Sequence, residues 1–250
     1  MMHRFVKGLL LGILFICSIG LLWFLVIQPF LTQKDAEDLK AQYIVTAPQA
    51  ESAESEQDGG EKHQLDFASL RSRYPDVHAW LTIPGTCVDY PVVQSDADDP
   101  EYYLRRNYDG RWRLAGSLFF QYDCTPKSKN VVIFGHNMND GTMFGVLEKL
   151  TEQKFREQHS TIFLETEVGV REYRIAAVLT TDLSRIPFNR TVFADEQDYL
   201  AFAGTMLEGT GYEPQAVKRL LTLVTCAYNW DGARTVVVAE IGRASCRERV

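Results

Sequence analysis

The amino-acid sequence predicts a mainly β domain, a barrel or a sandwich, that follows one apolar helix and a polar linker. Short apolar or alternating runs recur over residues 77–241, and Pro, Gly or Asp clusters separate most of them, which is typical of a sandwich or barrel. A charge-free run of membrane-spanning length lies near the N-terminus. The chain has 250 residues, of which 46% are hydrophobic, so its composition permits a real core.

The first element is an apolar helix. Residues 8–27, GLLLGILFICSIGLLWFLVI, carry no charge, so they are able to cross a bilayer core. Arg4 and Lys7 precede this run, and the positive-inside rule therefore predicts a cytoplasmic N-terminus and an exported remainder. A cleaved signal peptide is the alternative, but its apolar core is normally shorter and ends at a small-x-small site. We therefore predict a retained anchor over residues 1–31.

A polar linker is predicted over residues 32–64. Residues 32–43 are expected to form a polar helix that extends away from the membrane. The stretch AESAESEQDGGE has few apolar residues and mostly acidic charge, which predicts a solvated segment. The folded domain is expected over residues 65–241, soluble and active without the anchor. The tail 242–250, GRASCRERV, fits neither part; we interpret it as a disordered end or a non-native piece and exclude it from the functional argument.

The domain is predicted to begin with a short helix. Leu65, Phe67, Leu70 and Tyr74 fall on one side of such a helix, and Pro75 ends it. The strands expected after it are residues 77–83, 88–93, 117–122, 130–134, 161–165, 172–181, 219–225 and 235–241.

Two helices are expected to interrupt the strands. The first covers residues 143–150, behind Thr142 as a candidate N-cap. The second covers residues 195–207 and carries acidic residues in its first turn, as the helix dipole favours.

Charge and cysteine content narrow the function classes. The formal net charge of −7 argues against a general nucleic-acid binder, which usually needs a basic face. The five cysteines, at positions 17, 87, 124, 226 and 246, form no C-x-x-C pair, so neither a zinc knuckle nor a disulfide-dense scaffold is indicated. The sequence does not decide whether Cys87 and Cys124 form a disulfide. A lone thiol in an exported domain calls for an explanation.

The segment 220–239, LLTLVTCAYNWDGARTVVVA, predicts a reactive site. An apolar run ends at Cys226, a polar turn follows, and a second strand-like run begins at Arg234. A hairpin here would bring a thiol and a guanidinium together at the open end of a sheet. His136 ends the apolar run VVIFGH and completes the candidate set. The other histidines, at positions 3, 63, 78 and 159, lack such a setting.

These three residue types suit acyl transfer. Cysteine is a good nucleophile as thiolate, and a histidine both supplies positive charge and handles the leaving-group proton. The oxyanion needs a fixed donor, and arginine presents several in a rigid fork. Each residue alone has a structural explanation, since a free cysteine is usually a small buried hydrophobe. Together, Cys226, His136 and Arg234 predict transfer through a thioester, because all three lie at strand ends.

Each of three residues in the turn between Cys226 and Arg234 has two interpretations. Tyr228 and Trp230 either line a peptide groove or pack against the rim of the sheet. Asp231 either pairs with Arg234 or is a solvated turn residue, and the solvated residue is favoured.

Several motifs resemble the sortase family, class B most closely. Residues 222–226, TLVTC, followed by Arg234 resemble the sortase signature Thr-Leu-x-Thr-Cys…Arg at every fixed position. The segments FGHNM at 134–138 and GTMFGVL at 141–147 are similar to the class B histidine region. The segments AWLTIPGT, VDYPVVQ and AGSLFF, which begin at residues 79, 88 and 115, resemble the early strands of the family. The resemblance covers about residues 67–241, and the motifs occur in the family's order.

The resemblance implies a closed eight-stranded β-barrel with N-terminal helices, and a helical insertion before the cysteine strand that residues 195–207 fit. It implies a cysteine transpeptidase in which Cys226 attacks a Thr carbonyl of a C-terminal sorting signal, His136 is the general acid and base, and Arg234 stabilises the oxyanion or orients the signal. Leu104, Val224 and Tyr228 are candidates for the signal groove.

The resemblance also implies the setting of the enzyme. Its partners are surface proteins that bear a sorting signal and an amine from a peptidoglycan precursor or a pilin. It implies a single-pass protein of a Gram-positive-type cell membrane with the catalytic domain outside. No metal or cofactor is needed, and no nucleic acid is expected.

Other functions remain open at this point. A cysteine peptidase that only hydrolyses would use the same three residues. A membrane-anchored binding module with an inactive barrel is a second alternative. A metal hydrolase is disfavoured, because His136 and Cys226 have no obvious additional ligands in the sequence.

Overall fold

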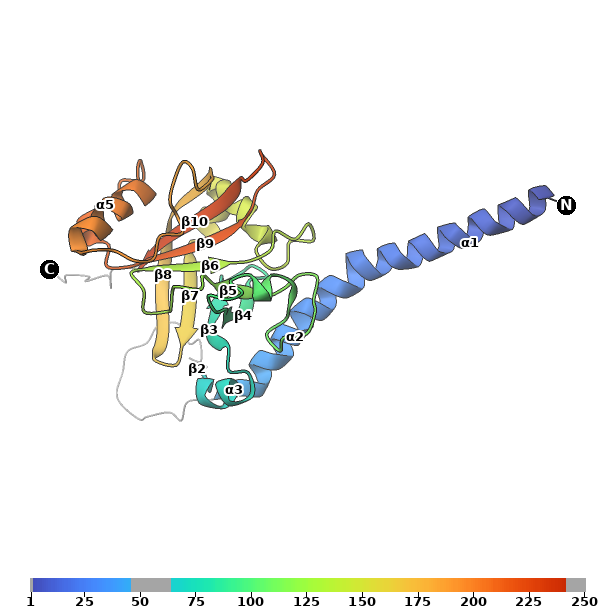
Figure 1. The fold of residues 1–250 in the computed structure, drawn as a ribbon, viewed down its shortest axis with the longest axis horizontal. Coiled ribbons are helices and arrows are strands. Elements are labelled where there is room, and N and C mark those ends of the chain that lie inside the picture. The colour runs from blue at the N-terminus through green and yellow to red at the C-terminus, as the bar shows by residue number, and fades with distance from the viewer. Residues whose placement is uncertain (1, 46–63, 242–250) are drawn as a thin grey trace.

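The structure is a computed structural model that describes residues 2–45 and 64–241 (Figure 1). The whole acidic stretch of the predicted linker, residues 50–61, and the tail 242–250 lie outside the described residues.

Eight strands close into a barrel in the order β10-β8-β7-β3-β4-β5-β6-β9. Their bounds are β3 Val77–Thr82, β4 Asp89–Gln94, β5 Leu118–Phe120, β6 Asn130–Phe134, β7 Thr161–Thr166, β8 Gly169–Thr181, β9 Leu220–Cys226 and β10 Arg234–Ile241. Each strand overlaps one of the predicted runs, so the closed eight-stranded barrel implied by the resemblance is confirmed. Closure leaves no exposed sheet edge.

Two strand pairs, β4–β5 and β6–β9, are parallel, and the others are antiparallel. The parallel β6–β9 pair matters for function, because the ends of two parallel strands emerge at the same rim. Every residue of β9 from Leu220 to Thr225 is buried, and only the last residue, Cys226, is exposed. The burial pattern therefore places the thiol where the barrel meets solvent.

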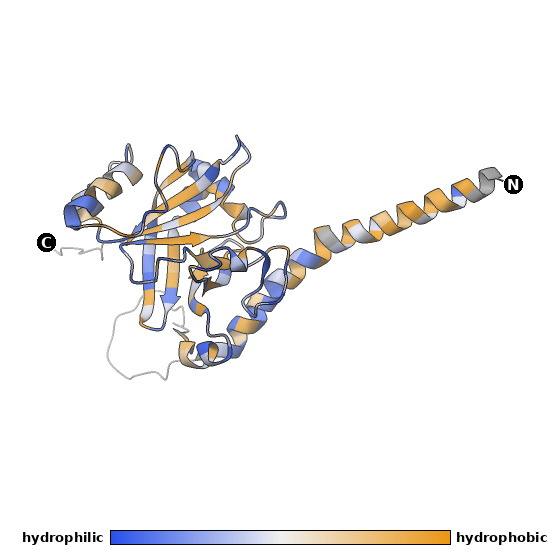
Figure 2. Cartoon of the chain, in the orientation of Figure 1, coloured by the Kyte–Doolittle hydropathy of each residue, from blue (hydrophilic) through white to orange (hydrophobic). Residues whose placement is uncertain are grey.

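One long helix leads into the barrel from the N-terminus. It consists of α1 (Met2–Leu22), a π-helical segment η1 (Trp23–Ile27) and α2 (Gln28–Tyr43), and α1 projects away from the barrel (Figure 1). Figure 2 shows that α1 is predominantly apolar. Among the described residues this is the one helix long and apolar enough to cross a membrane, with a mean hydropathy of 2.8 over its most apolar window.

The second half of this helix packs on the barrel. Thr32, Ala36 and Leu39, spaced by four and three residues, are buried, which is the spacing of one helix face. Lys40 Nζ lies 2.7 Å from Asp89 Oδ1 at the start of β4. The helix predicted for residues 32–43 is therefore present, but it lies against the domain and does not extend away from it.

A short antiparallel pair, β1 (Ile44–Val45) and β2 (Gln64–Leu65), follows α2. Helix α3 (Phe67–Arg73) begins two residues later than position 65, because Asp66 Oδ1 accepts a hydrogen bond from Ser69 N at 3.0 Å and caps the helix. A short 3₁₀ segment, η2 (Tyr102–Arg105), precedes β5.

The first predicted insertion is helical but differs in detail. Residues 145–151 form a 3₁₀ segment, η3 (Gly145–Thr151), followed by α4 (Gln153–Gln158). Thr142 does not cap it, because its hydroxyl and its N–H both bond Asp140 Oδ1 and the chain turns at Met143, whose φ is 52°.

The second insertion agrees with the prediction. Helix α5 (Glu196–Met206) begins after Asp195, whose Oδ1 accepts from Asp198 N at 2.9 Å. It lies at the end of the domain opposite α1 (Figure 1). A final 3₁₀ turn, η4 (Pro214–Ala216), leads into β9.

Candidate active site

The parallel pairing of β6 and β9 brings His136 to the level of Cys226. Phe134 pairs with Val224 in the register, and each functional residue lies two positions beyond its strand partner. Gly135 N donates to Val224 O at 3.1 Å, and Thr225 Oγ1 donates to Gly135 O at 2.8 Å. A Cβ at position 135 would lie 2.5 Å from the Leu118 side chain, so only glycine permits this close approach.

The hairpin between β9 and β10 brings Arg234 beside Cys226. The two residues are directly opposed in the antiparallel register, so their side chains project from the same face of the pair, with Cβ atoms about 5 Å apart. Ala227 N donates to Ala233 O at 3.0 Å and closes the turn, in which Gly232 has a φ of +82°. The hairpin predicted from the sequence is present.

Burial sets the protonation state of His136. The ring is half-buried, and its Nε2 lies 2.7 Å from the carbonyl oxygen of Leu104. Burial and the charge of Arg105 lower the pKa of His136 below its ordinary value of 6.5, against the opposing effect of the Leu104 carbonyl. The imidazole is therefore neutral at neutral pH. A carbonyl only accepts, so Nε2 carries the proton and Nδ1 has the free lone pair.

Cys226, His136 and Arg234 all line one groove of about 550 Å³. Leu104 and Val224, two of the candidates for the signal groove, also line it. The connection between β8 and α5 supplies the opposite wall. The lining residues are Pro100, Glu101, Leu104, Phe119, Gln121, Tyr122, Asp123, Phe134, Gly135, His136, Asn189, Arg190, Thr191, Val192, Val224, Thr225, Cys226 and Arg234.

A family model described as the sortase domain matches residues 81–242 of the chain. The chain belongs to the sortase family. Sortases are cysteine transpeptidases, so membership gives the class of reaction.

Individual relatives place this sortase in class B. It is 30% identical to sortase B of Staphylococcus aureus over 196 residues, which cover 74% of the chain and 79% of that protein. It is 36% identical to sortase B of Listeria monocytogenes over 166 residues, 64% of the chain and 67% of that protein.

Solved structures agree. Sortase B of Bacillus anthracis superposes with a TM-score of 0.68 at 26% identity, over 87% of this chain and 99% of that one. The Staphylococcus aureus sortase B–substrate complex gives 0.62 at 29% identity, over 72% and 85%.

Tyr228 lies outside the groove of this sortase. Its side chain is 75% exposed, and it lines a separate hollow with Thr180, Thr235 and residues of η3. Tyr228 therefore does not line the groove that holds Cys226, because the tight turn after Cys226 directs residue 228 toward the β8–η3 side. Its contact with the signal stays a prediction.

Trp230 packs against the rim. Its Nε1 donates to Asp182 Oδ2 at 2.9 Å, just beyond β8, and the Arg185 guanidinium lies 4.6 Å from the ring centre. Of the two interpretations of Trp230, the structure supports rim packing. Arg234 Nη1 donates to the carbonyl of Ala233 at 2.9 Å. This hydrogen bond fixes one nitrogen of the Arg234 guanidinium.

The four described cysteines are free, including Cys87 and Cys124. Cys87 Sγ donates to Gly141 O at 2.8 Å, and Cys124 Sγ lies 3.4 Å from Val132 O. Burial raises the pKa of Cys87 and raises that of Cys124 to about 12. Both thiols are therefore protonated and unreactive, whereas Cys226 is exposed at the groove.

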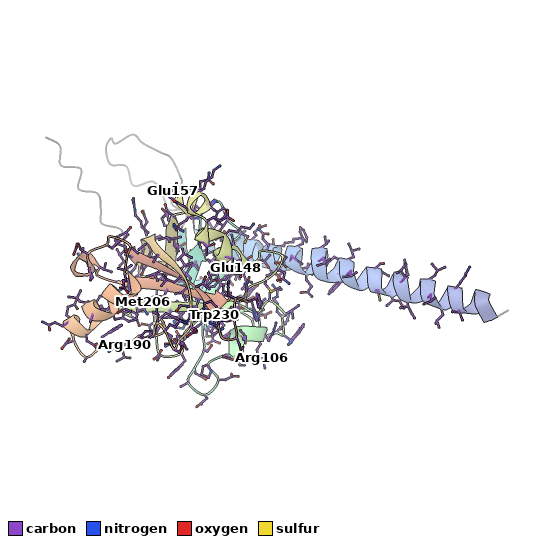
Figure 3. The ribbon with its side chains drawn as sticks, turned by 90° about the horizontal axis from the view of Figure 1, so that it is seen from above. Arg106, Glu148, Glu157, Arg190, Met206 and Trp230 are labelled. Atoms are coloured by element: carbon purple, nitrogen blue, oxygen red, sulfur yellow. The ribbon has the colours of Figure 1, made fainter. Side chains whose placement is uncertain are left out.

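Asn137 is a residue that sequence reasoning missed. Its Nδ2 donates to Cys226 O at 2.8 Å and to Glu148 Oε1 at 2.8 Å. Asn137 thus ties the segment that carries the imidazole to the backbone of the nucleophile. Figure 3 labels Glu148 and Trp230 on the barrel part of the molecule.

Proposed function

We propose that this sortase is held in the cell membrane of a Gram-positive-type bacterium and attaches surface proteins to an amine. It would cleave a C-terminal sorting signal through a thioacyl intermediate on Cys226. The observation that carries the proposal is that Cys226, His136 and Arg234, from three segments of the chain, line one groove.

In the first half-reaction, the neutral His136 accepts the thiol proton and Cys226 Sγ attacks the scissile carbonyl carbon. Negative charge develops on the carbonyl oxygen, and Arg234 donates hydrogen bonds to it. The peptide C–N bond breaks as His136 returns the proton to the leaving amine. A thioester between the substrate and Cys226 remains.

In the second half-reaction, an acceptor amine attacks the thioester carbonyl. His136 removes a proton from the attacking nitrogen, the C–S bond breaks, and the thiol recovers its proton. The new amide joins the surface protein to its acceptor. An amine from a peptidoglycan precursor or a pilin suits this step.

The groove offers both apolar and polar side chains to the signal. We assign Leu104 and Val224 to contacts with its apolar side chains, because both line the groove beside the three reacting groups. The helix Val6–Tyr43 supports the anchoring, since its apolar window is 0% buried and Arg4 and Lys7 precede the charge-free run 8–27.

The test uses the full chain in detergent or membranes with pentapeptide sorting signals, with and without an amine acceptor. Mass spectrometry is expected to show a thioacyl adduct on Cys226 and a ligated product when the amine is present, and Cys226→Ala should give neither. Hydrolysis alone at saturating amine would show that the enzyme is a peptidase. Normal surface anchoring in a Cys226→Ala strain would show a binding module.

A further inference from the structure

A basic hairpin, residues 105–113, lies beside the groove but is not part of the proposed reaction. Its sequence RRNYDGRWR contains four arginines and one aspartate, a formal charge of +3 (four minus one), whereas the chain as a whole carries −7. Figure 3 shows Arg106 on the half of the domain from which α1 emerges, with Arg190 and Met206 on the opposite half.

The hairpin is held by its own backbone. Arg106 and Trp112 form an antiparallel bridge, Arg113 N donates to Arg105 O at 2.9 Å, and Asn107 N donates to Arg111 O at 2.8 Å. Trp112 and Arg111 are among the residues that this frame presents to solvent, and Arg111 Nε lies 3.6 Å from Asp109 Oδ2 in an exposed ion pair, which is weak in water. Trp112 is 68% exposed and the Arg111 side chain is 88% exposed. An exposed indole beside a cation is a pair of side chains that suits the interface between a membrane and water.

The hairpin packs against α2 near the end of the apolar helix. Arg113 forms an ion pair with Asp35, and Tyr108 and Arg113 line a small cavity with Thr32 and Ala36. In Figure 1 the segment before β5 lies beside α2.

The apolar surface of the helix ends just before this contact. Phe30 and Leu31 are still 64% and 39% exposed, and Thr32 is already buried against the domain. With a rise of about 1.5 Å per residue, Thr32 to Ala36 lie roughly 8–14 Å beyond Ile27. The headgroup layer of a bilayer is about 5–8 Å deep on each side. The part of α2 that the hairpin contacts therefore lies at or just beyond the outer edge of the headgroups when residues 8–27 span the membrane.

We propose that the 105–113 hairpin docks on the anionic phospholipid headgroups of the membrane that holds α1. Trp112 inserts its indole at the interface, and Arg111 binds lipid phosphate with its guanidinium fork. This inference rests on the proposed anchoring of the chain. Because the hairpin continues directly from η2, whose Leu104 carbonyl holds His136, docking fixes the height of the groove above the bilayer.

The test reconstitutes the full chain in nanodiscs that contain phosphatidylglycerol and a lipid spin-labelled near its headgroup. A Trp23→Phe background removes the indole of the anchor. Of the other tryptophans, Trp80 is buried and Trp230 packs on the rim against Asp182, so any residual signal in the Trp112→Phe variant is that of these two indoles. We expect tryptophan fluorescence to be quenched in this background and most of the quenching to disappear when Trp112→Phe is added. Arg111→Gln should lower the equilibrium constant for docking about fivefold. Replacing phosphatidylglycerol with a zwitterionic lipid should also weaken docking.

The charge-matched control is Arg174→Gln on β8, whose side chain is 61% exposed and should leave quenching unchanged. Equal quenching with and without Trp112 would overturn docking. Quenching of the same size in anionic and in zwitterionic lipid would also overturn docking. So would an Arg111→Gln variant that docks as the parent does and loses only the binding of soluble polyphosphate. Alkaline extraction tests the anchor separately: a chain that is extracted refutes the anchoring, whereas a retained chain without Trp112 quenching refutes the docking alone.

Discussion

Replacing Asn137 tests whether the alignment of nucleophile and imidazole depends on one side-chain amide. In the structure its Nδ2 bridges Cys226 O and Glu148 Oε1, both at 2.8 Å. Asn137→Ala removes both hydrogen bonds and leaves the side chains of Cys226 and His136 unaltered. The neutral bond to the Cys226 carbonyl contributes about 0.5–1.5 kcal/mol to stability. The bond to exposed Glu148 is screened by solvent, so the total loss should be about 1–2 kcal/mol.

The effect on turnover should exceed the effect on stability. A displacement of about 1 Å between reacting groups costs about a hundredfold in rate, which corresponds to roughly 2.7 kcal/mol of activation free energy. We therefore expect kcat/KM of Asn137→Ala to fall by about a hundredfold at a temperature where the variant is fully folded. Asn137→Asp should be worse, because a carboxylate would face the Cys226 carbonyl and Glu148, which are both acceptors.

The assay pairs urea unfolding with peptide turnover under the same conditions. Glu148→Gln is the matched control, because its amide oxygen still accepts from Asn137, and it should stay within about threefold of the parent. A variant Asn137→Ala that loses the expected stability yet keeps kcat/KM within threefold would refute the positioning role of the amide.

Three further predictions follow from the same site and from α2. Arg234→Lys should lower kcat/KM by about a hundredfold with unchanged thermal stability, because a point charge does not reproduce the planar fork; near-normal turnover would refute the assigned role. Arg105→Gln removes a positive charge that lowers the pKa of His136, so the acid limb of the pH–rate profile should move to higher pH, while the control Arg106→Gln leaves it in place. Since the pKa of His136 is lowered in the folded protein, its contribution to stability is present above pH 6.5 and declines as the pH falls below that value. Leu39→Ala should cost about 2–4 kcal/mol in urea unfolding, because Leu39 is buried in a core cluster with Trp80; a loss below 0.5 kcal/mol would show that α2 does not stabilise the barrel.

The packing of α2 changes one expectation drawn from the sequence. A domain that begins at Leu65 lacks Ala36 and Leu39, which are buried, and Lys40, which pairs with Asp89. Truncation at residue 65 should therefore destabilise the barrel, whereas truncation at Gln28 keeps this face. Only one large apolar residue, Leu39, marks the buried side of the helix, and that signal is too weak to separate a packed helix from a solvated stalk.

Local sequence patterns also did not predict the contacts between distant segments. The imidazole of His136 meets a carbonyl 32 residues away, and Asn137 meets the Cys226 carbonyl 89 residues away. A backbone carbonyl has no residue identity to detect, and an asparagine after a strand is common in turns. The position of Tyr228 next to the nucleophile suggested the groove, but the geometry of the turn places its side chain in a separate hollow.

The sequence by itself determined the strands, the hairpin that opposes Cys226 to Arg234, and the apolar helix. These depend on alternation, turn residues and run length, which act between near neighbours. Only the tertiary structure decided which wall His136 joins, what holds its ring, and where α2 and the 105–113 hairpin lie. Those features depend on strand order and packing across the closed barrel, where a contact depends on the positions of both partners.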